Sequence, residues 1–246
     1  GTVTQNTGNG LPNAFTTGSV SIDNPNHVDL SRATAISSTG SLNLLSGHFR
    51  LGNFSFTLAA TSILGGNAFN NTNMIVTGGT GQLIKSFPTG APTFTYPVGD
   101  DVSGNDYSPV TLDFTANNTA RNIGVNVTDT RHPQDILVPD YITRYWSFTN
   151  TGAGTHTVNA TFTYASTGDV VGTLANIDLS RFDINAASPT FSTWNSYTTT
   201  RTGNDLSISG ASNFLLPTAN YSFDFTGRTI DPLYYYRSVN NGNWNN

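Results

Sequence analysis

The sequence predicts an all-β protein, with a short β-solenoid-like N-terminal portion followed by an antiparallel β-sandwich. All fifteen acidic residues are aspartates, and the single lysine is Lys85. Glu and Lys favour exposed helices, whereas Asp favours turns and caps, so this composition disfavours helices. Apolar residues alternate with polar ones at a period of two, which is typical of strands. Strand length changes along the chain, and this change separates the two portions.

The first portion, residues 1–86, contains short apolar pairs separated by Gly, Asn, Ser and Asp. Strands of three to five residues with tight polar corners are typical of a β-solenoid, in which each turn buries two or three side chains. No strict repeat length is visible, so a set of short strands at one end of a sandwich is the alternative. The pairs lie at residues 20–22, 28–30, 42–44, 49–51, 54–58, 74–76 and 83–84.

The second portion, residues 87–230, contains longer alternating segments that indicate a sandwich of immunoglobulin or jelly-roll type. Two prolines and a glycine near residues 86–92 mark the boundary, and turn residues at 117–118 and 203–205 predict hairpins. Trp146 alternates with apolar neighbours and is expected in the core. Residues 231–246 are expected to connect to a following unit. The predicted strands lie at residues 107–115, 123–127, 141–148, 158–164, 182–184, 206–208 and 221–225.

Charge and composition limit the classes of partner. The net charge is −5 and no basic run is present, so a nucleic-acid partner is not expected. No apolar stretch approaches the roughly 20 residues of a membrane span, so membrane insertion is not expected. Abundant Thr and Asn with no cysteine suit a secreted protein at the cell surface.

The densest acidic run is residues 100–106, which contains Asp100, Asp101 and Asp106 around a glycine. Oxygen donors at alternating positions could bind calcium. The spacing is not that of an EF-hand and the closing Glu is missing, so a hairpin turn is the simpler interpretation. Both interpretations remain open from the sequence.

No catalytic residues are predicted, and the chain is not expected to be an enzyme. Asp129, Asp135 and Asp140 lie near His132 and could form a glycosidase pair, but the sequence indicates no apolar pocket that would raise a carboxyl pKa. The four histidines lack metal-ligand spacing, and a nucleophile elbow is absent. Trp194, in an expected loop, is the candidate for stacking on a sugar ring.

Four segments resemble the repeat modules of very large Bacteroidota surface proteins that the type IX system secretes, similar to gliding-motility adhesins. A looser match (VSI at residues 20–22 and HVDL at 27–30) precedes them. The four segments are residues 77–87 (TGGTGQLIKSF), residues 94–100 with 107–112 (FTYPVGD and YSPVTL), residues 143–146 (TRYW), and a terminal segment with YYY at 234–236 and GNW at 242–244.

The resemblance implies a non-catalytic module of a tandem array outside the cell, whose partners are neighbouring modules of the same chain. Tyr235 and Trp244 would then contact the next module. Two other functions stay open: a carbohydrate-binding module of a surface protein or polysaccharide-degrading enzyme, with surface glycans as partners, and a phage or viral fibre domain.

Overall fold

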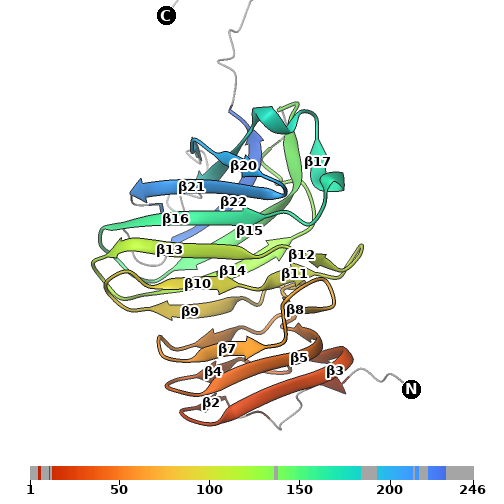
Figure 1. Ribbon diagram of the computed structural model, residues 1–246, viewed down its shortest axis with the longest axis vertical. Coiled ribbons are helices and arrows are strands. Elements are labelled where there is room, and N and C mark those ends of the chain that lie inside the picture. Colours follow the sequence, from red (N-terminus) through yellow and green to blue (C-terminus); the bar gives the residue numbers. More distant parts are fainter. Residues whose placement is uncertain are drawn as a thin grey trace, which may run out of the picture.

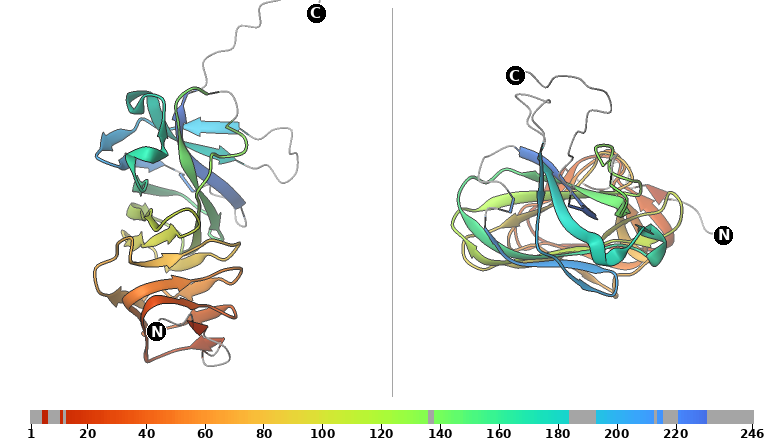
Figure 2. Two further views of the ribbon diagram at one scale, coloured as in Figure 1. Left: turned by 90° about the vertical axis from the view of Figure 1, so that its right-hand side faces the viewer. Right: turned by 90° about the horizontal axis from the view of Figure 1, so that it is seen from above.

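The computed structural model describes residues 5–6, 11, 13–135, 138–183, 193–212, 214–215 and 221–230. These residues form an all-β fold, which confirms the predicted class, with only two short 3-10 turns, η1 (Thr167–Asp169) and η2 (Leu174–Asn176). Among them, no helix has the length and apolar character needed to span a membrane. The strands stack along the long axis of the molecule (Figures 1 and 2).

The N-terminal strands wind as a parallel solenoid, shown in red and orange at the bottom of Figure 1. Its rungs contribute strands to two sheets, and within each sheet successive rungs pair in parallel. The strands of one sheet are β1 (Gln5–Asn6), β3 (Ser19–Asp29), β5 (Ser41–Arg50), β7 (Ile63–Gly66) and β8 (Asn73–Val76). Those of the other are β2 (Ala14–Phe15), β4 (Thr34–Ile36), β6 (Phe56–Leu58) and β9 (Leu83–Phe87).

The rungs differ in length, which explains why the sequence shows no strict repeat. Ser19 pairs with Ser41 and Ser41 with Ile63, and the hydroxyls of Ser19 and Ser41, 22 residues apart, are hydrogen-bonded at 2.7 Å. Later rungs are longer, since Phe56 pairs with Leu83. The added residues enter at the corners, where the stacked strands do not constrain length.

A glycine allows the chain to turn a tight corner in the solenoid. Gly47 has φ of +76°, in the left-handed region that disfavours other residues. A Cβ at Gly47 would lie 1.7 Å from the carbonyl oxygen of Asn24 in the rung below. Both the backbone angle and the stacking distance therefore require glycine here.

The fourth rung joins the solenoid to the sandwich. It consists of β9, β10 (Thr93–Tyr96) and β11 (Val98–Asp100), and each of these strands pairs antiparallel with a later strand. The partners are β14 (Arg121–Thr128), β13 (Val110–Asn117) and β12 (Asp106–Tyr107). Meanwhile β9 stays parallel to β6 and β11 stays parallel to β8. Residue 86, the predicted boundary, lies within β9.

The sandwich consists of a five-stranded sheet packed on the upper part of a ten-stranded sheet. The five-stranded sheet has the order β10-β13-β16-β21-β20, and the ten-stranded sheet has the path β19-β18-β22-β15-β14-β9-β6-β4-β2, with β17 beside β15. The remaining strands are β15 (Tyr141–Asn150), β16 (His156–Thr163), β17 (Val170–Val171), β18 (Ile177–Asp183), β19 (Thr193–Ser196), β20 (Thr200–Thr202), β21 (Asp205–Ser212) and β22 (Tyr221–Thr229).

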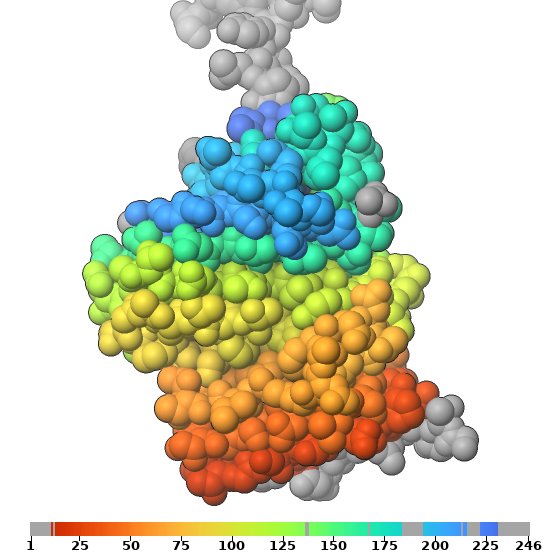
Figure 3. Space-filling view, viewed as in Figure 1, coloured from red at the N-terminus to blue at the C-terminus, as the bar shows by residue number. Residues whose placement is uncertain are grey.

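One apolar core runs through both portions, from Ile22 in the solenoid to Phe225 in the last strand. Trp146 is fully buried, as the alternation predicted, and its ring lies 5.1 Å from that of Phe162. The space-filling view shows solenoid and sandwich as successive layers of one body (Figure 3). Sheet and core are therefore both continuous across the fourth rung.

Lys85 on β9 fixes the corner that follows β6. Its Nζ donates hydrogen bonds to the carbonyl oxygens of Ala59, Ala60 and Ser62, at 2.5, 3.0 and 3.1 Å. Burial lowers the pKa of Lys85 to about 8, so the side chain still carries its charge at neutral pH. The ammonium group thus satisfies three carbonyls of one corner.

Replacing Lys85 with Met is expected to lower the free energy of unfolding by about 2 kcal/mol, because hydrogen bonds from a charged donor are lost and carbonyls are left unsatisfied. Urea denaturation at pH 7 measures the change. The adjacent Ser86→Ala removes an exposed hydroxyl bond to Asn122 and is expected to cost less than about 0.5 kcal/mol. Equal losses for the two variants would refute the role of Lys85.

Candidate functional site

The most unusual side chain of the sandwich is Arg144, a fully buried arginine on β15. Strand alternation places Arg144 on the interior face together with its neighbours Ile142 and Trp146, which are also fully buried. A guanidinium in this position has lost its contact with water. It is tolerated only where acceptors and opposite charge replace the hydration.

Four aspartates surround the Arg144 guanidinium. Nη1 donates to Asp100, Nη2 to Asp106 at 3.1 Å and to Asp129 at 2.9 Å, and Nε to Asp169 at 3.2 Å. These carboxylates come from β11, β12, the segment after β14, and η1. Arg144 therefore ties the fourth solenoid rung to distant parts of the sandwich. We call this set of five residues the Arg144 cluster.

The Arg144 cluster holds four carboxyl groups and one guanidinium, an excess of three negative charges when all are ionised. Burial raises the pKa of Asp100, and the hydrogen bond and charge of Arg144 only partly offset that effect. Burial alone would lower the pKa of Arg144, but the hydrogen bond that Arg144 donates to Asp100 and the charges of the surrounding carboxylates raise it. Arg144 thus stays charged and is the counter-ion of the cluster.

Two of the three proposed calcium ligands, Asp100 and Asp106, lie in the Arg144 cluster. One oxygen from each, with one from Asp129, form a group within 4.8 Å of one another, a geometry that could hold a metal. Calcium, however, takes six to eight oxygen ligands. Here Arg144 already binds an oxygen of all three carboxylates. The guanidinium therefore already supplies one positive charge to these three carboxylates.

Millimolar calcium is expected to leave the Tm of the wild-type protein unchanged, because the Arg144 guanidinium already binds an oxygen of each carboxylate that calcium would need. In Arg144→Met the same carboxylates lack a cation, so calcium is expected to raise the Tm of that variant. Differential scanning fluorimetry with calcium, and with magnesium for comparison, measures both. A calcium-dependent Tm rise in the wild type would instead establish a calcium site there.

Asp101, the third proposed ligand, lies apart from the Arg144 cluster and binds the solenoid. Its Oδ2 accepts hydrogen bonds from Arg50 Nε at 2.6 Å and lies 3.2 Å from His48 Nδ1. Burial would raise the pKa of Asp101, but the bonds from His48 and Arg50 outweigh burial and lower it. Adjacent residues thus serve separate networks, one in the sandwich and one on β5.

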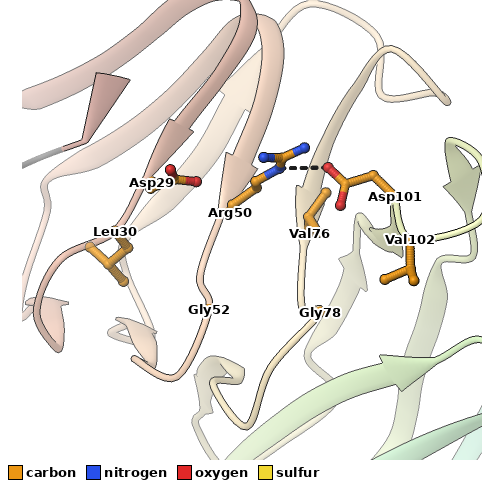
Figure 4. Close-up of a pocket in the computed structure, with 8 residues that line it drawn as sticks. All are labelled: Asp29, Leu30, Arg50, Gly52, Val76, Gly78, Asp101 and Val102. Atoms are coloured by element: carbon orange, nitrogen blue, oxygen red, sulfur yellow. Dashed lines mark hydrogen bonds and ion pairs between the residues drawn. The ribbon is translucent and has the colours of Figure 1, made fainter. Parts of the chain in front are cut away.

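A surface hollow of about 380 Å³ lies beside the Asp101 contact. Figure 4 shows Arg50 reaching across the hollow to Asp101, with Asp29 on the other side. The Arg50 Nη1 group also lies 2.8 Å from His27 Nε2. The charged groups of the hollow are therefore largely engaged with one another. Its lining residues are Asp29, Leu30, Arg50, Gly52, Val76, Gly78, Asp101 and Val102.

The three aspartates considered for a glycosidase have three different sets of partners. Asp129 binds Arg144, whereas Asp135 accepts from Arg228 Nε at 2.8 Å. Asp140 accepts from the backbone N–H of residue 173 at 2.6 Å and from the side chain of residue 176 at 3.0 Å. Each carboxylate thus has a structural partner of its own, and these contacts do not assemble an acid–base pair.

Trp194, the proposed sugar-stacking residue, lies in strand β19 rather than in the expected loop, because it pairs with Phe182 on β18. Its ring centroid is 4.9 Å from that of Phe182 and 5.0 Å from that of His132. The guanidinium carbon of Arg228 lies 4.3 Å from the Trp194 ring centroid. Trp194 is half-buried, and Arg228 covers a ring face that a sugar would need.

Tyr235 and Trp244, the proposed module contacts, lie outside the described residues.

Comparison with known proteins adds no relative to this description: no family model, no curated protein and no solved structure matches the chain.

Proposed function

We propose that the chain is a non-catalytic structural module of a secreted surface protein of the adhesin or filament type, and that it acts together with neighbouring modules. The observation that carries the proposal is the unbroken strand ladder of the ten-stranded sheet, which runs from β2 in the solenoid to β19 in the sandwich. Backbone hydrogen bonds join each strand of this ladder to the next, so they connect the solenoid to the sandwich without a break. A catalytic role would require a reactive constellation, and the carboxylates discussed above are bound to structural partners.

The path of the chain supports a load-bearing role. β2 and β3 lie at one end of the long axis, and β22 leads out at the other end (Figure 1). The pulling direction of a filament would then follow the stack of rungs. Arg144 adds polar ties between the fourth rung and the sandwich, because it binds Asp100 on β11 and Asp169 in η1.

Single-molecule pulling on a polyprotein of this module, alternating with a reference domain, tests the proposal. We expect one unfolding event per module, with a released length that matches residues 14–230 at roughly 3.5 Å per residue. Two separate events, one for the solenoid and one for the sandwich, would contradict a single load-bearing unit. Unfolding of the solenoid alone at low force would contradict a single load-bearing unit in the same way.

Carbohydrate binding is the second candidate. Arg228 covers one face of the half-buried Trp194 ring, but the exposed Asn195 and Ser196 beside Trp194 favour this function. A structural module is expected to give no signal on a glycan array or in an insoluble-polysaccharide pull-down. If binding is seen and Trp194→Ala abolishes it, the sugar-binding function replaces the purely structural one. Phe54→Ala, which removes an exposed aromatic of the solenoid, is the matched control and should retain any binding.

A further inference from the structure

We propose that one small monovalent anion of about the size of chloride binds between Arg121 and His156, at the end of the sandwich where the β13–β14 and β15–β16 turns meet. Arg121 begins β14 and His156 begins β16. Both turns lie at the left of Figure 1. This site is independent of the proposed structural function.

Arg121 differs from the other buried arginines of the described residues. Arg144, Arg181 and Arg228 each have a carboxylate within ion-pair distance. Arg121 is only 2% exposed and, within the described part of the chain, has no such carboxylate. Beyond the described residues the only acidic side chain is Asp231. A buried cation without a counter-charge is costly, so Arg121 calls for an anion.

The hydrogen bonds of Arg121 leave one donor group unused. Nε donates to the side-chain oxygen of Asn117 at 2.7 Å, and Nη2 donates to the carbonyl oxygen of Gly154 at 3.2 Å. Nη1 is buried and has no partner among the described residues. Buried polar groups of native proteins are nearly always satisfied, so an unpaired guanidinium N–H indicates an absent acceptor.

His156 presents a second unused donor. Its Nε2 accepts a hydrogen bond from the backbone N–H of Leu215 at 3.0 Å, which places the proton of the neutral ring on Nδ1. Nδ1 is buried and lacks a partner among the described residues. The carbonyl oxygen of Gly154 lies near the ring and raises the pKa of His156, but its geometry is not that of a hydrogen bond to Nδ1. This oxygen already accepts a hydrogen bond from Arg121.

The two unused donors belong to the same site. The charge of Arg121 acts on the His156 ring, and the Gly154 carbonyl oxygen that accepts from Arg121 Nη2 also lies near His156. The ring centroids of His156 and Phe114 are 5.9 Å apart, and the Arg121 guanidinium carbon lies 5.8 Å from the Phe114 centroid. The facing turn wraps this site closely, since a Cβ at Gly152 would lie 2.3 Å from the Arg121 Cβ. Arg121 is thus held in place rather than free to turn toward solvent.

The charge around the site is positive. Burial, and then the charge of Arg121, lower the pKa of His156 to about 4, so His156 is neutral at pH 7. Arg181 also raises the local potential, although Asp183 pairs with it at 2.9 Å. A water molecule would accept both hydrogen bonds but would leave the charge of Arg121 uncompensated. An anion would accept both hydrogen bonds and also compensate the positive charge of Arg121, so the site favours an anion over water.

Crystals grown in sodium bromide test the proposal directly, because bromide replaces chloride and scatters anomalously. We expect an anomalous peak within hydrogen-bonding distance of Arg121 Nη1 and His156 Nδ1. A water molecule without anomalous signal at that position, or no density there, would overturn the proposal. This measurement uses the wild-type protein and does not depend on the folding of a variant.

A solution experiment provides a second measurement. With ionic strength held constant by gluconate, which is too large for a site of this kind, the wild-type Tm is expected to rise by several degrees as chloride replaces gluconate. Arg121→Gln and His156→Gln are expected to lose the chloride dependence. Arg201→Gln, which removes a partly exposed partner of Asp178, should keep the chloride dependence. A chloride response that is the same in all four proteins would count against a specific site.

Discussion

Arg144→Met is expected to lower the free energy of unfolding by about 3–5 kcal/mol, because it leaves buried carboxylates without their counter-ion. The guanidinium is fully buried and binds Asp100, Asp106, Asp129 and Asp169, so no solvent can take its place. Urea denaturation at pH 7, followed by circular dichroism, measures the loss. Methionine keeps most of the side-chain volume, so the effect reports the charge rather than a cavity.

Acidic pH and a surface variant provide the controls for Arg144→Met. The cost is expected to shrink as the pH is lowered, since Asp100, whose pKa burial raises, takes up a proton and the repulsion between the carboxylates decreases. Arg201→Met removes a partly exposed pair with Asp178 and hydrogen bonds to two backbone carbonyls, and it should cost less than Arg144→Met because it leaves no buried carboxylate without a counter-ion. A loss below about 1 kcal/mol for Arg144→Met would contradict the assigned role.

Phe87→Ala is expected to cost about 3–5 kcal/mol, because it opens a cavity at the junction of solenoid and sandwich. Phe87 ends β9 and is 2% exposed, and its ring lies 5.1 Å from that of Phe114 and 6.4 Å from those of Phe94 and Tyr96. These rings come from strands of the fourth rung and of the five-stranded sheet. The variant should therefore destabilise the solenoid and the sandwich together.

The matched substitution for Phe87→Ala is Phe54→Ala, which removes a solenoid ring that is 40% exposed. We expect this change to cost less than about 1 kcal/mol because little contact with the core is lost. Thermal and urea unfolding of both variants, read by circular dichroism, provide the comparison. Similar losses for the two variants would show that the junction is not part of the shared core.

The strands were predictable from sequence because successive side chains of a strand point to opposite faces of the sheet, so apolar residues alternate with polar ones. Residues 141–148 were expected to form a strand with Trp146 inside, and β15 has Trp146 fully buried. The solenoid was predictable from short apolar pairs, whereas the longer later rungs hid its repeat. The fourth rung could not be predicted from sequence. In it β9 pairs in parallel with β6 and antiparallel with β14, and the residues of β9 carry no local pattern that indicates two kinds of pairing.

The Arg144 cluster was only partly predictable. The acidic run at residues 100–106 identifies Asp100 and Asp106 as candidate ligands, but their partner Arg144 lies 44 and 38 residues further along the chain. Asp129 and Asp169 join the cluster from segments without any motif. The sequence also could not separate Asp100 from Asp101, although the end of β11 directs their side chains to different networks. Such contacts arise only when distant strands come together.

Peptide-resolved hydrogen exchange across a urea series tests the central claim that solenoid and sandwich form one unit. We predict that amides of β6 in the solenoid and of β15 in the sandwich open with the same free energy and the same dependence on urea. The reason is that β9 hydrogen-bonds to both β6 and β14, and one core underlies all four strands. Opening of β6 at a urea concentration where β15 remains protected would contradict the claim.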